Sequence, residues 1–324
     1  MLKVENLNIK ININGKAYPV LEDVSFMLNK GDALGLVGES GCGKSLTALA
    51  IMGMLRNNIV IDSGSIMFNG IDLAKCAEKE YKDLRGKKIS MIFQDSMSSL
   101  NPLMKVGKQI KEAYELHYDL NRDALKDKTI EALKNVGFKN PEEAMNKYPH
   151  QLSGGQRQRV MTAIAISAHP ELLIADEPTT ALDVITENKI LSMLKRIQEE
   201  NHISIIIISH DITVVSRTCS HVAVMYSGHI VEYGETGEVI KNPRHPYTRA
   251  LINSIPDASA KDKPLNIING QVPSLTERPK TGCTFAERCN YRTDECKGDV
   301  GRYKTDTGSI VRCCIYKDDE RYEQ

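Results

Sequence analysis

The sequence predicts a mixed α/β fold with a parallel sheet at its centre. Three observations support this prediction. Residues 33–37 form a short apolar run before a glycine-rich loop, residues 172–175 form a second apolar run that ends in two carboxylates, and "ISIIIISHD" (203–211) is β-branched and ends near a histidine. Continuous apolar runs, rather than alternating ones, are typical of strands buried in parallel sheets.

The order of these segments predicts the organisation of the chain. Residues 1–240 are expected to form one domain, with an antiparallel β edge and the glycine-rich loop in its first 95 residues and a helical subdomain over about 96–158. Residues 241–324 are expected to form an irregular, cysteine-rich extension. A stretch so rich in proline, glycine and charge is expected to bury little apolar surface, so another device must hold it.

The bulk composition narrows the class of protein. Hydrophobic residues make up 41% of the 324, which suffices for a sizeable core. The 42 basic residues balance the 42 acidic residues, so the overall charge gives no reason to expect a nucleic-acid partner. No window approaches the roughly 18 to 20 apolar residues of a membrane span, and no export signal is evident. We therefore expect the protein in the cytosol.

The glycine-rich loop carries the strongest motif. Gly38-x-x-x-x-Gly43-Lys44-Ser45 lies between an apolar strand and a periodic helix, which is the context that a P-loop requires. Backbone N–H groups and the helix amino terminus would bind phosphate, Lys44 would neutralise it, and Ser45 would supply a hydroxyl to Mg²⁺. The residues expected to bind a nucleotide here are Gly38, Glu39, Ser40, Gly41, Cys42, Gly43, Lys44 and Ser45.

Two further strands are expected to deliver catalytic side chains. Asp176 and Glu177 follow the apolar run at 172–175, and ligands bind at the carboxyl ends of strands in α/β sheets. Asp176 suits the Mg²⁺ shell, and Glu177 suits a general base that polarises the attacking water. His210, at the end of the third strand, could reach the γ-phosphate. A lone histidine is more often structural, but its position downstream of the P-loop and the acidic pair favours the functional role.

A second helix amino terminus lies between these strands, in "QLSGGQRQRVMTAIAIS". Ser153 and two glycines precede a helix with apolar residues at helical spacing. The segment can be an ordinary helix capped by Ser153, or an amino terminus that meets an anion. Its position between the P-loop and the acidic pair favours the second interpretation.

Together these segments resemble the ATP-binding cassette (ABC) family, whose nucleotide-binding subunits carry the same set in the same order. The resemblance implies that Gly38 to Ser45 are the Walker A loop, that residues 152–156 (LSGGQ) are the signature motif, and that Asp183 is the D-loop aspartate. It also implies that Gln94 contacts Mg²⁺ or water and senses the membrane partner. The implied catalytic residues are Glu177, His210 and Gln94, and the implied Mg²⁺ ligands are Ser45, Gln94 and Asp176.

The family also stacks an aromatic side chain on adenine upstream of the first core strand. Tyr18 is the aromatic residue available there, and the alternative is a tyrosine with no role beyond ending a strand.

The chain has one P-loop and one signature motif, and this count implies a partner. In the family, the signature of one subunit closes over the nucleotide in the P-loop of another, so the resemblance implies a second ABC ATPase. A heterodimer is expected, with a homodimer as the lesser alternative. The residues implied to contact ATP in trans are Ser153, Gly154, Gly155, Gln156 and Asp183. Two ATP molecules would close the dimer, and hydrolysis would reopen it.

Three further segments resemble one branch of the family. "DSMSSLNPLMKVGKQI" (95–110) resembles the segment that receives permease subunits in peptide importers, while "NPRHPYTRALINSIP" (242–256) and "GQVPSLTERPKTGC" (270–283) resemble the extension of oligopeptide, dipeptide and nickel importers. The resemblance implies a peripheral ATPase at the cytoplasmic face of the membrane, two permeases and an external binding protein. Peptides are the expected cargo, with nickel or a nickel–metallophore complex as the alternative cargo. A soluble regulatory ATPase is a lesser alternative to the importer function itself.

Five of the eight cysteines lie in the extension. A stable disulfide is disfavoured in a reducing cytosol, and zinc would prefer closer C-x₂-C pairs. A [4Fe–4S] cluster accepts irregular spacing, and importers of this branch that the extension resembles hold one. The expected ligands are Cys283, Cys289, Cys296 and Cys313, with Cys314 as an alternative to Cys313, and with zinc or free thiols as alternatives to the cluster.

Overall fold

The computed structural model of the 324-residue chain describes residues 1–255 and 268–322. Pro256, the last residue of the segment 242–256, therefore lies outside the described residues. The chain divides into two compact units. The first contains residues 1–29, 33–75 and 209–324, and the second contains residues 30–32 and 76–208.

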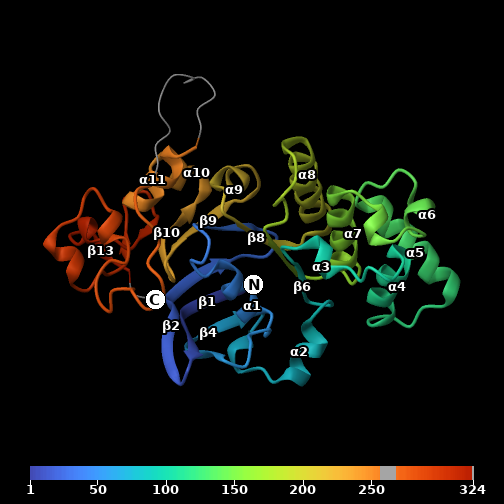
Figure 1. The fold of residues 1–324 in the computed structure, drawn as a ribbon, viewed down its shortest axis with the longest axis horizontal. Helices are drawn as coiled ribbons and strands as arrows, with labels where there is room; N and C mark the ends of the chain where they lie inside the picture. Colours follow the sequence, from blue (N-terminus) through green and yellow to red (C-terminus); the bar gives the residue numbers. More distant parts are fainter. Residues whose placement is uncertain (256–267, 323–324) are drawn as a thin grey trace. The chain divides into compact units, whose positions relative to one another are not determined.

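The first unit contains an antiparallel sheet with the strand order β2-β1-β4-β5 (Figure 1). These strands are β1 (Leu2–Ile13), β2 (Lys16–Leu28), β4 (Ile59–Phe68) and β5 (Ile71–Asp72). Asn14 and Gly15 join β1 to β2, and both have positive φ, as the tightest hairpins require. The predicted antiparallel β edge is therefore present.

A second group of strands in the first unit supports the P-loop. β3 (Ala33–Val37) pairs in parallel with β9 (His221–Tyr226), and α1 (Lys44–Ile51) begins within the loop that follows β3. All five residues of β3 are buried. α9 (Ile212–Thr218) packs closely on β3, because a Cβ added at Gly35 would lie 2.1 Å from Cγ1 of Val215.

The extension continues this group of strands. β10 (His229–Glu235) pairs antiparallel with β9 and with β12 (Ile310–Val311), and β11 (Tyr303–Lys304) pairs with β12 and with β13 (Glu320–Arg321). The short helices α10 (Thr236–Lys241) and α11 (Pro246–Asn253) follow β10. Tyr247, Phe285 and Val311 are almost fully buried. The extension thus buries more apolar surface than its composition suggested, and it belongs to the first unit.

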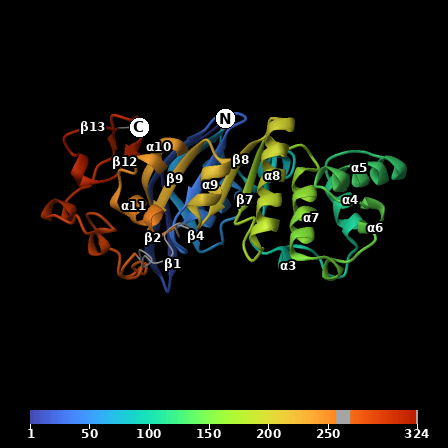
Figure 2. The same cartoon turned by 90° about the horizontal axis from the view of Figure 1, so that it is seen from above.

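The second unit combines a parallel sheet with most of the helices. β6 (Ile89–Ile92), β7 (Leu172–Asp176) and β8 (Ser204–Ser209) pair in parallel. The unit's helices are α2 (Glu78–Leu84), α3 (Ser96–Ser99), α4 (Val106–Glu115), α5 (Arg122–Asn135), α6 (Pro141–Ala144), α7 (Gly154–Ile166) and α8 (Val184–Asn201). In Figure 2, α4, α5 and α6 cluster beside α7, within the range expected for a helical subdomain. Among the described residues, no helix has the length and apolarity that crossing a membrane demands.

Candidate nucleotide site

The lysine of the P-loop hydrogen-bonds to backbone carbonyl groups of the same loop. The buried Lys44 Nζ donates hydrogen bonds to the carbonyl oxygens of Gly38 (2.7 Å) and Glu39 (3.0 Å), and it lies 3.7 Å from Sγ of Cys42. Burial raises the pKa of the Cys42 thiol, which keeps this side chain neutral beside Lys44. The loop therefore holds its cation at the centre, where an incoming phosphate would meet it.

Two of the loop glycines are required by close packing. A Cβ at Gly38 would lie 2.0 Å from the carbonyl oxygen of Met225 in β9, and a Cβ at Gly43 would lie 2.3 Å from Cδ2 of Leu21 in β2. Both glycines have positive φ, 154° and 110°. The loop thus rests directly on β9 and β2, and any other residue at these positions would push it away.

Two predicted site residues of the first unit lie near the surface. Tyr18 lies in β2 and is partly exposed, with Nζ of Lys16 5.1 Å from its ring centroid. His210 is exposed and directly follows β8. The roles of Tyr18 as the adenine platform and of His210 as the γ-phosphate contact stay predictions.

The carboxyl end of β7 brings two of the predicted catalytic residues together. Asp176 is buried, and Glu177 follows it with φ of 45°, in the left-handed region. Oε2 of Glu177 accepts hydrogen bonds from Nε2 of Gln94 (2.9 Å) and from Oγ1 of Thr180 (2.7 Å). Gln94 follows β6, so two neighbouring parallel strands position the pair. Thr180 was not expected in the site.

The signature motif begins α7. Oγ of Ser153 accepts a hydrogen bond from the N–H of Gln156 (3.3 Å), and Oε1 of Gln156 accepts one from the N–H of Ser153 (3.0 Å). This reciprocal pair is a capping box, so Ser153 does cap the helix, as the simpler interpretation of the segment expected. The cap leaves the interpretation as an anion-contacting amino terminus untested.

The signature motif lies against the D-loop within the second unit. A Cβ added at Gly155 would lie 2.4 Å from Cγ2 of Thr186, in the first turn of α8. Asp183 caps α8 and accepts hydrogen bonds from N (3.0 Å) and Oγ1 (2.8 Å) of Thr186. These bonds hold the pKa of Asp183 below its usual range. Thr186 therefore joins Gly155 and Asp183, two of the residues expected to face a partner subunit.

Two residues of the extension contact the P-loop, and no local sequence pattern predicted either contact. Tyr247 Oη accepts a hydrogen bond from the N–H of Glu39 (2.9 Å), and the Arg288 guanidinium pairs with the Glu39 carboxylate. Tyr247 lies in "HPYTRALINSIP", whose resemblance to importer extensions marked the segment but assigned it no contact with nucleotide-binding residues.

The extension also gathers cysteine thiols. Sγ of Cys296 lies 3.1 Å from Sγ of Cys314, whereas Cys313 packs with Tyr303 and Val311 in a small apolar cluster. Burial raises the pKa of Cys283 to about 11 and that of Cys313 to about 12. In the part of the chain that the structure describes, no three or more histidine, cysteine or acidic side chains converge closely enough to hold a metal ion. The structure thus places Cys314, the alternative fourth ligand, against Cys296.

An apolar groove of about 590 Å³ adjoins the strand that leads to Gln94. Phe93, Leu100, Leu116 and Met161 contribute apolar walls, while Arg85 and His117 contribute polar ones. Phe93 is 36% exposed and Leu116 is 80% exposed. The groove includes residues of the segment 95–110, which was expected to receive a permease.

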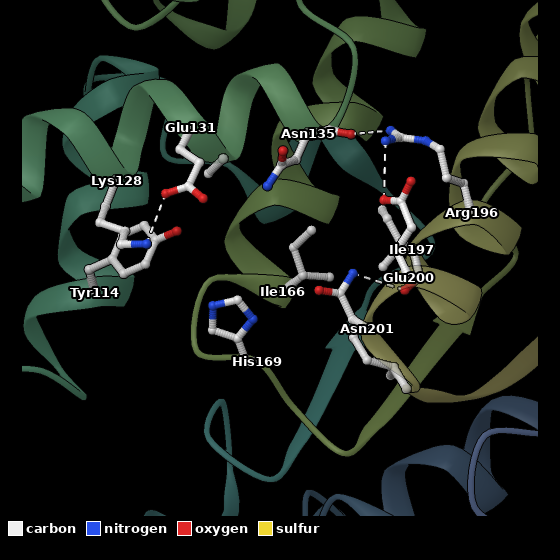
Figure 3. A pocket seen from close by; sticks show the side chains of 12 residues that line it. Tyr114, Lys128, Glu131, Asn135, Ile166, His169, Arg196, Ile197, Glu200 and Asn201 are labelled. Carbon is white, nitrogen blue, oxygen red and sulfur yellow. Dashed lines mark hydrogen bonds and ion pairs between the residues drawn. The ribbon is translucent and has the colours of Figure 1, made fainter.

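A smaller cavity of about 80 Å³ lies elsewhere in the second unit, between side chains of α5 and α8 (Figure 3). Nζ of Lys128 lies 2.8 Å from Oε2 of Glu131, and Arg196 pairs with Glu200. None of the predicted site residues lines this cavity. Figure 3 shows these charged side chains around the cavity. Such ion pairs are typical of a contact between helices that water can reach.

The family profile described as "ABC transporter" matches residues 21–180, and the profile described as "Oligopeptide/dipeptide transporter, C-terminal region" matches residues 231–296. The chain is 41% identical over 321 residues to the oligopeptide transport ATP-binding protein AppD of Bacillus subtilis (strain 168), with 98% of each chain covered. The chain belongs to the family of ABC transporter ATP-binding proteins. It is also 40% identical to the dipeptide transport ATP-binding protein DppD of Escherichia coli (strain K12), covering 92% of this chain and 91% of that one.

Solved ABC cassettes confirm the predicted fold. A dimeric structure of the ATP-binding cassette MJ0796 bound to ADP and Pi matches with a TM-score of 0.66 and 26% identity, covering 73% of this chain and 99% of that one. A structure of CbiO1 from Clostridium perfringens matches with a TM-score of 0.65 and 29% identity, covering 74% and 90%. The ABC cassette fold with its α/β core and antiparallel β subdomain is therefore established for this chain.

Proposed function

We propose that this ABC transporter ATP-binding protein is the ATP-hydrolysing subunit of a bacterial importer of oligopeptides or dipeptides. The hydrogen bond between Gln94 and Glu177 carries the ATPase part of the proposal, because it places a polar sensor on the carboxylate that would activate water. The match of residues 231–296 to the oligopeptide/dipeptide extension, and the names of the relatives, support the cargo. They favour peptides over nickel, and a transporter over a soluble regulatory ATPase.

Each site residue has a specific chemical task in this proposal. Backbone N–H groups of the P-loop and the Lys44 ammonium bind the β- and γ-phosphates, and Glu177 polarises the attacking water. Ser45, Asp176 and Gln94 are the residues that would hold Mg²⁺, which neutralises phosphate charge when bound. His210 contacts the γ-phosphate, and Tyr18 stacks on adenine.

A second cassette completes the site. In the proposed dimer, Ser153, Gly154, Gly155, Gln156 and Asp183 of one subunit face the P-loop of the other. The signature helix brings its amino terminus to the γ-phosphate. We propose a heterodimer with a related ATPase, in which the domain over 1–240 carries the nucleotide chemistry and residues 241–324 form the extension.

Two permease subunits are the proposed membrane partners, fed by an external binding protein. The groove that contains Phe93 and Leu116 supports this part of the proposal, since exposed apolar side chains beside Gln94 suit a helix from a permease. The ATPase would then lie at the cytoplasmic face of the membrane.

We propose that the cysteines of the extension hold a [4Fe–4S] cluster, with zinc as the alternative. Thiolates are the ligands that both groups prefer, and the contact between Cys296 and Cys314 supports a thiol centre in this region. Cys283, Cys289 and Cys296 would be ligands, with Cys313 or Cys314 as the fourth. Binding would require these thiols to move closer together, because no three of them converge on one point in the part of the chain that the structure describes. The group when bound would cross-link the extension and supply no step of hydrolysis.

Anaerobic purification with iron, sulfide and zinc analysis tests this centre. Iron and sulfide in equal amounts support the cluster, stoichiometric zinc without iron refutes it, and the absence of all three refutes both groups. Separate Cys313→Ser and Cys314→Ser chains identify the fourth ligand, because only the ligand variant should lose metal.

Peptide uptake by cells, and ATPase activity of the assembly that co-purifies with the chain, test the proposed function. Glu177→Gln should abolish both while ATP binding is retained. A chain that remains in the cytosolic fraction as a homodimer, without permeases, would contradict the importer proposal. Uptake of nickel but not of peptides would contradict the proposed cargo.

A further inference from the structure

Glu39, the second residue of the P-loop, is held by two residues of the extension. Nη1 and Nη2 of Arg288 donate to Oε2 (2.7 Å) and Oε1 (3.0 Å) of Glu39, and Oη of Tyr247 accepts from its backbone N–H (2.9 Å). All three residues belong to the first unit. The extension therefore fixes both the side chain and the backbone of Glu39.

Arg288 is itself held from several directions. Its side chain is 6% exposed, and its remaining N–H groups donate to the carbonyl oxygens of Asn269 (2.8 Å) and Ile268 (3.3 Å) and to Oη of Tyr226 (3.3 Å). Only a planar guanidinium offers five donors in this fixed arrangement, so lysine could not make the same set of contacts.

Tyr247 is positioned by an aromatic cluster that also contains the Arg288 segment. Its buried ring lies 4.7 Å from that of Tyr226 and 5.4 Å from that of Phe285, measured between centroids. Phe285 precedes Arg288 by three residues. The two contacts to Glu39 thus come from separate segments of the extension that share one core.

The consequence for the P-loop follows from what Glu39 holds in turn. Its carbonyl oxygen accepts hydrogen bonds from Nζ of Lys44 (3.0 Å) and from the N–H of Cys42 (3.3 Å). A displaced Glu39 would move the carbonyl that holds Lys44. A carboxylate without its arginine would also repel the phosphates that the loop binds, because like charges destabilise one another at short range.

We propose that Arg288 is a positioning residue for ATP binding, through which the folded extension sets the conformation and charge of the P-loop. The proposal rests on the proposed ATPase function and adds regulation to it. The affinity for ATP then depends on whether the extension is folded. This holds even though the extension, residues 241–324, lies after the last nucleotide-binding motif in the sequence.

The test compares full-length chains in the co-purified assembly, with ATP affinity, KM for ATP and kcat measured for each. Arg288→Ala should raise the dissociation constant and KM about tenfold, because a charge-assisted pair is lost, while kcat stays within about twofold. Arg288→Lys should recover only part of the affinity. The exchange of both charges, Glu39→Arg with Arg288→Glu, should bind ATP more tightly than either single variant.

Arg292→Ala is the matched control, because Arg292 lies in the same segment and pairs with the exposed Glu287. It should leave affinity and KM unchanged. An Arg288→Ala chain with wild-type affinity and KM overturns the inference, as does an equal loss of kcat for Arg288→Ala and Arg292→Ala. Failure of the proposed function would look different, because the wild-type assembly would then show no hydrolysis that Glu177→Gln abolishes.

Discussion

Nε2 of Gln94 donates a hydrogen bond to Oε2 of Glu177 over 2.9 Å, although the two residues are 83 positions apart in sequence. The pairing of β6 with β7 makes the contact possible, because Gln94 and Glu177 follow the two strands at the same edge of the sheet. Gln94, which lies beside the groove proposed to bind the permease, thus contacts the proposed general base directly.

Loss of this hydrogen bond should slow hydrolysis without preventing ATP binding. We expect Gln94→Ala to lower kcat by about 10-fold to 100-fold, because a misplaced base loses part of its catalytic effect. Thr180→Val removes a second donor to Oε2 and should lower kcat by less. Phosphate release by the assembly at saturating ATP checks both, and a normal kcat for Gln94→Ala would contradict the assigned role.

Because Gly155 lies against Thr186, a side chain at position 155 of the signature motif should destabilise the protein. Gly155→Ala places a methyl group 2.4 Å from Cγ2 of Thr186, so we expect a loss of about 1–3 kcal/mol in the free energy of unfolding. Gly237→Ala is the control, since a Cβ there meets nothing within 4 Å and alanine favours the helix. Urea denaturation distinguishes them, and equal stabilities would refute the packing argument.

The hydroxyl of Tyr247 should stabilise the folded protein as well as hold the P-loop in position. Tyr247→Phe keeps the ring in its cluster but removes the acceptor for the N–H of Glu39, so we expect a loss of about 1–2 kcal/mol in the free energy of unfolding. The control Tyr291→Phe changes a residue that is 54% exposed, so it should alter the free energy of unfolding by less than about 0.5 kcal/mol. A stable Tyr247→Phe chain would show that the hydrogen bond is dispensable.

Buried histidines should make the first unit sensitive to acid. Burial lowers the pKa of His229 and that of His245 to about 3, so below pH 6.5 the unfolded chain binds protons that the folded chain does not. The free energy of unfolding should therefore fall as pH drops from 6.5 towards 3, by up to about 1.4 kcal/mol per pH unit for each histidine.

His245→Asn tests this dependence, because asparagine can keep the cap of α11 without titrating. Its stability should change less steeply between pH 6.5 and pH 4.5 than that of the unchanged chain. Burial raises the pKa of Glu232, which changes the free energy of unfolding with pH in the opposite direction. Both chains contain Glu232, so the difference between their pH dependences does not include this contribution. Parallel slopes for the two chains would contradict the assignment to His245.

Short contiguous motifs allowed the fold to be predicted, and they also indicated the nucleotide residues, whose roles stay predictions. A P-loop or a strand that ends in two carboxylates contains its own structural context, so residues 33–45 and 172–177 were sufficient to indicate the fold. Contacts across long separations were not accessible in this way. Arg288 lies 249 residues from Glu39, and nothing in its local spacing indicates that partner.

The same limit applies to the extension. Proline, glycine and charge predicted an irregular tail, but side-chain packing of Tyr247 and Phe285 and two-residue strands gave it a core. Strands this short leave almost no periodic signal in sequence. The sequence favoured Cys313 over the adjacent Cys314 as the fourth ligand, but it gave no sign that Cys313 packs in an apolar cluster while Cys314 lies against Cys296. The choice between the two stays a prediction.

The pairing of β12 with β10 has a practical consequence for shortening this chain. A protein cut after residue 240 would expose the outer backbone groups of β10, together with the apolar surface that Tyr247 and Phe285 cover. An open strand edge beside apolar surface is a template for intermolecular pairing. Removal of the last quarter of the sequence would therefore favour aggregation, so the nucleotide-binding part is best studied with its extension attached.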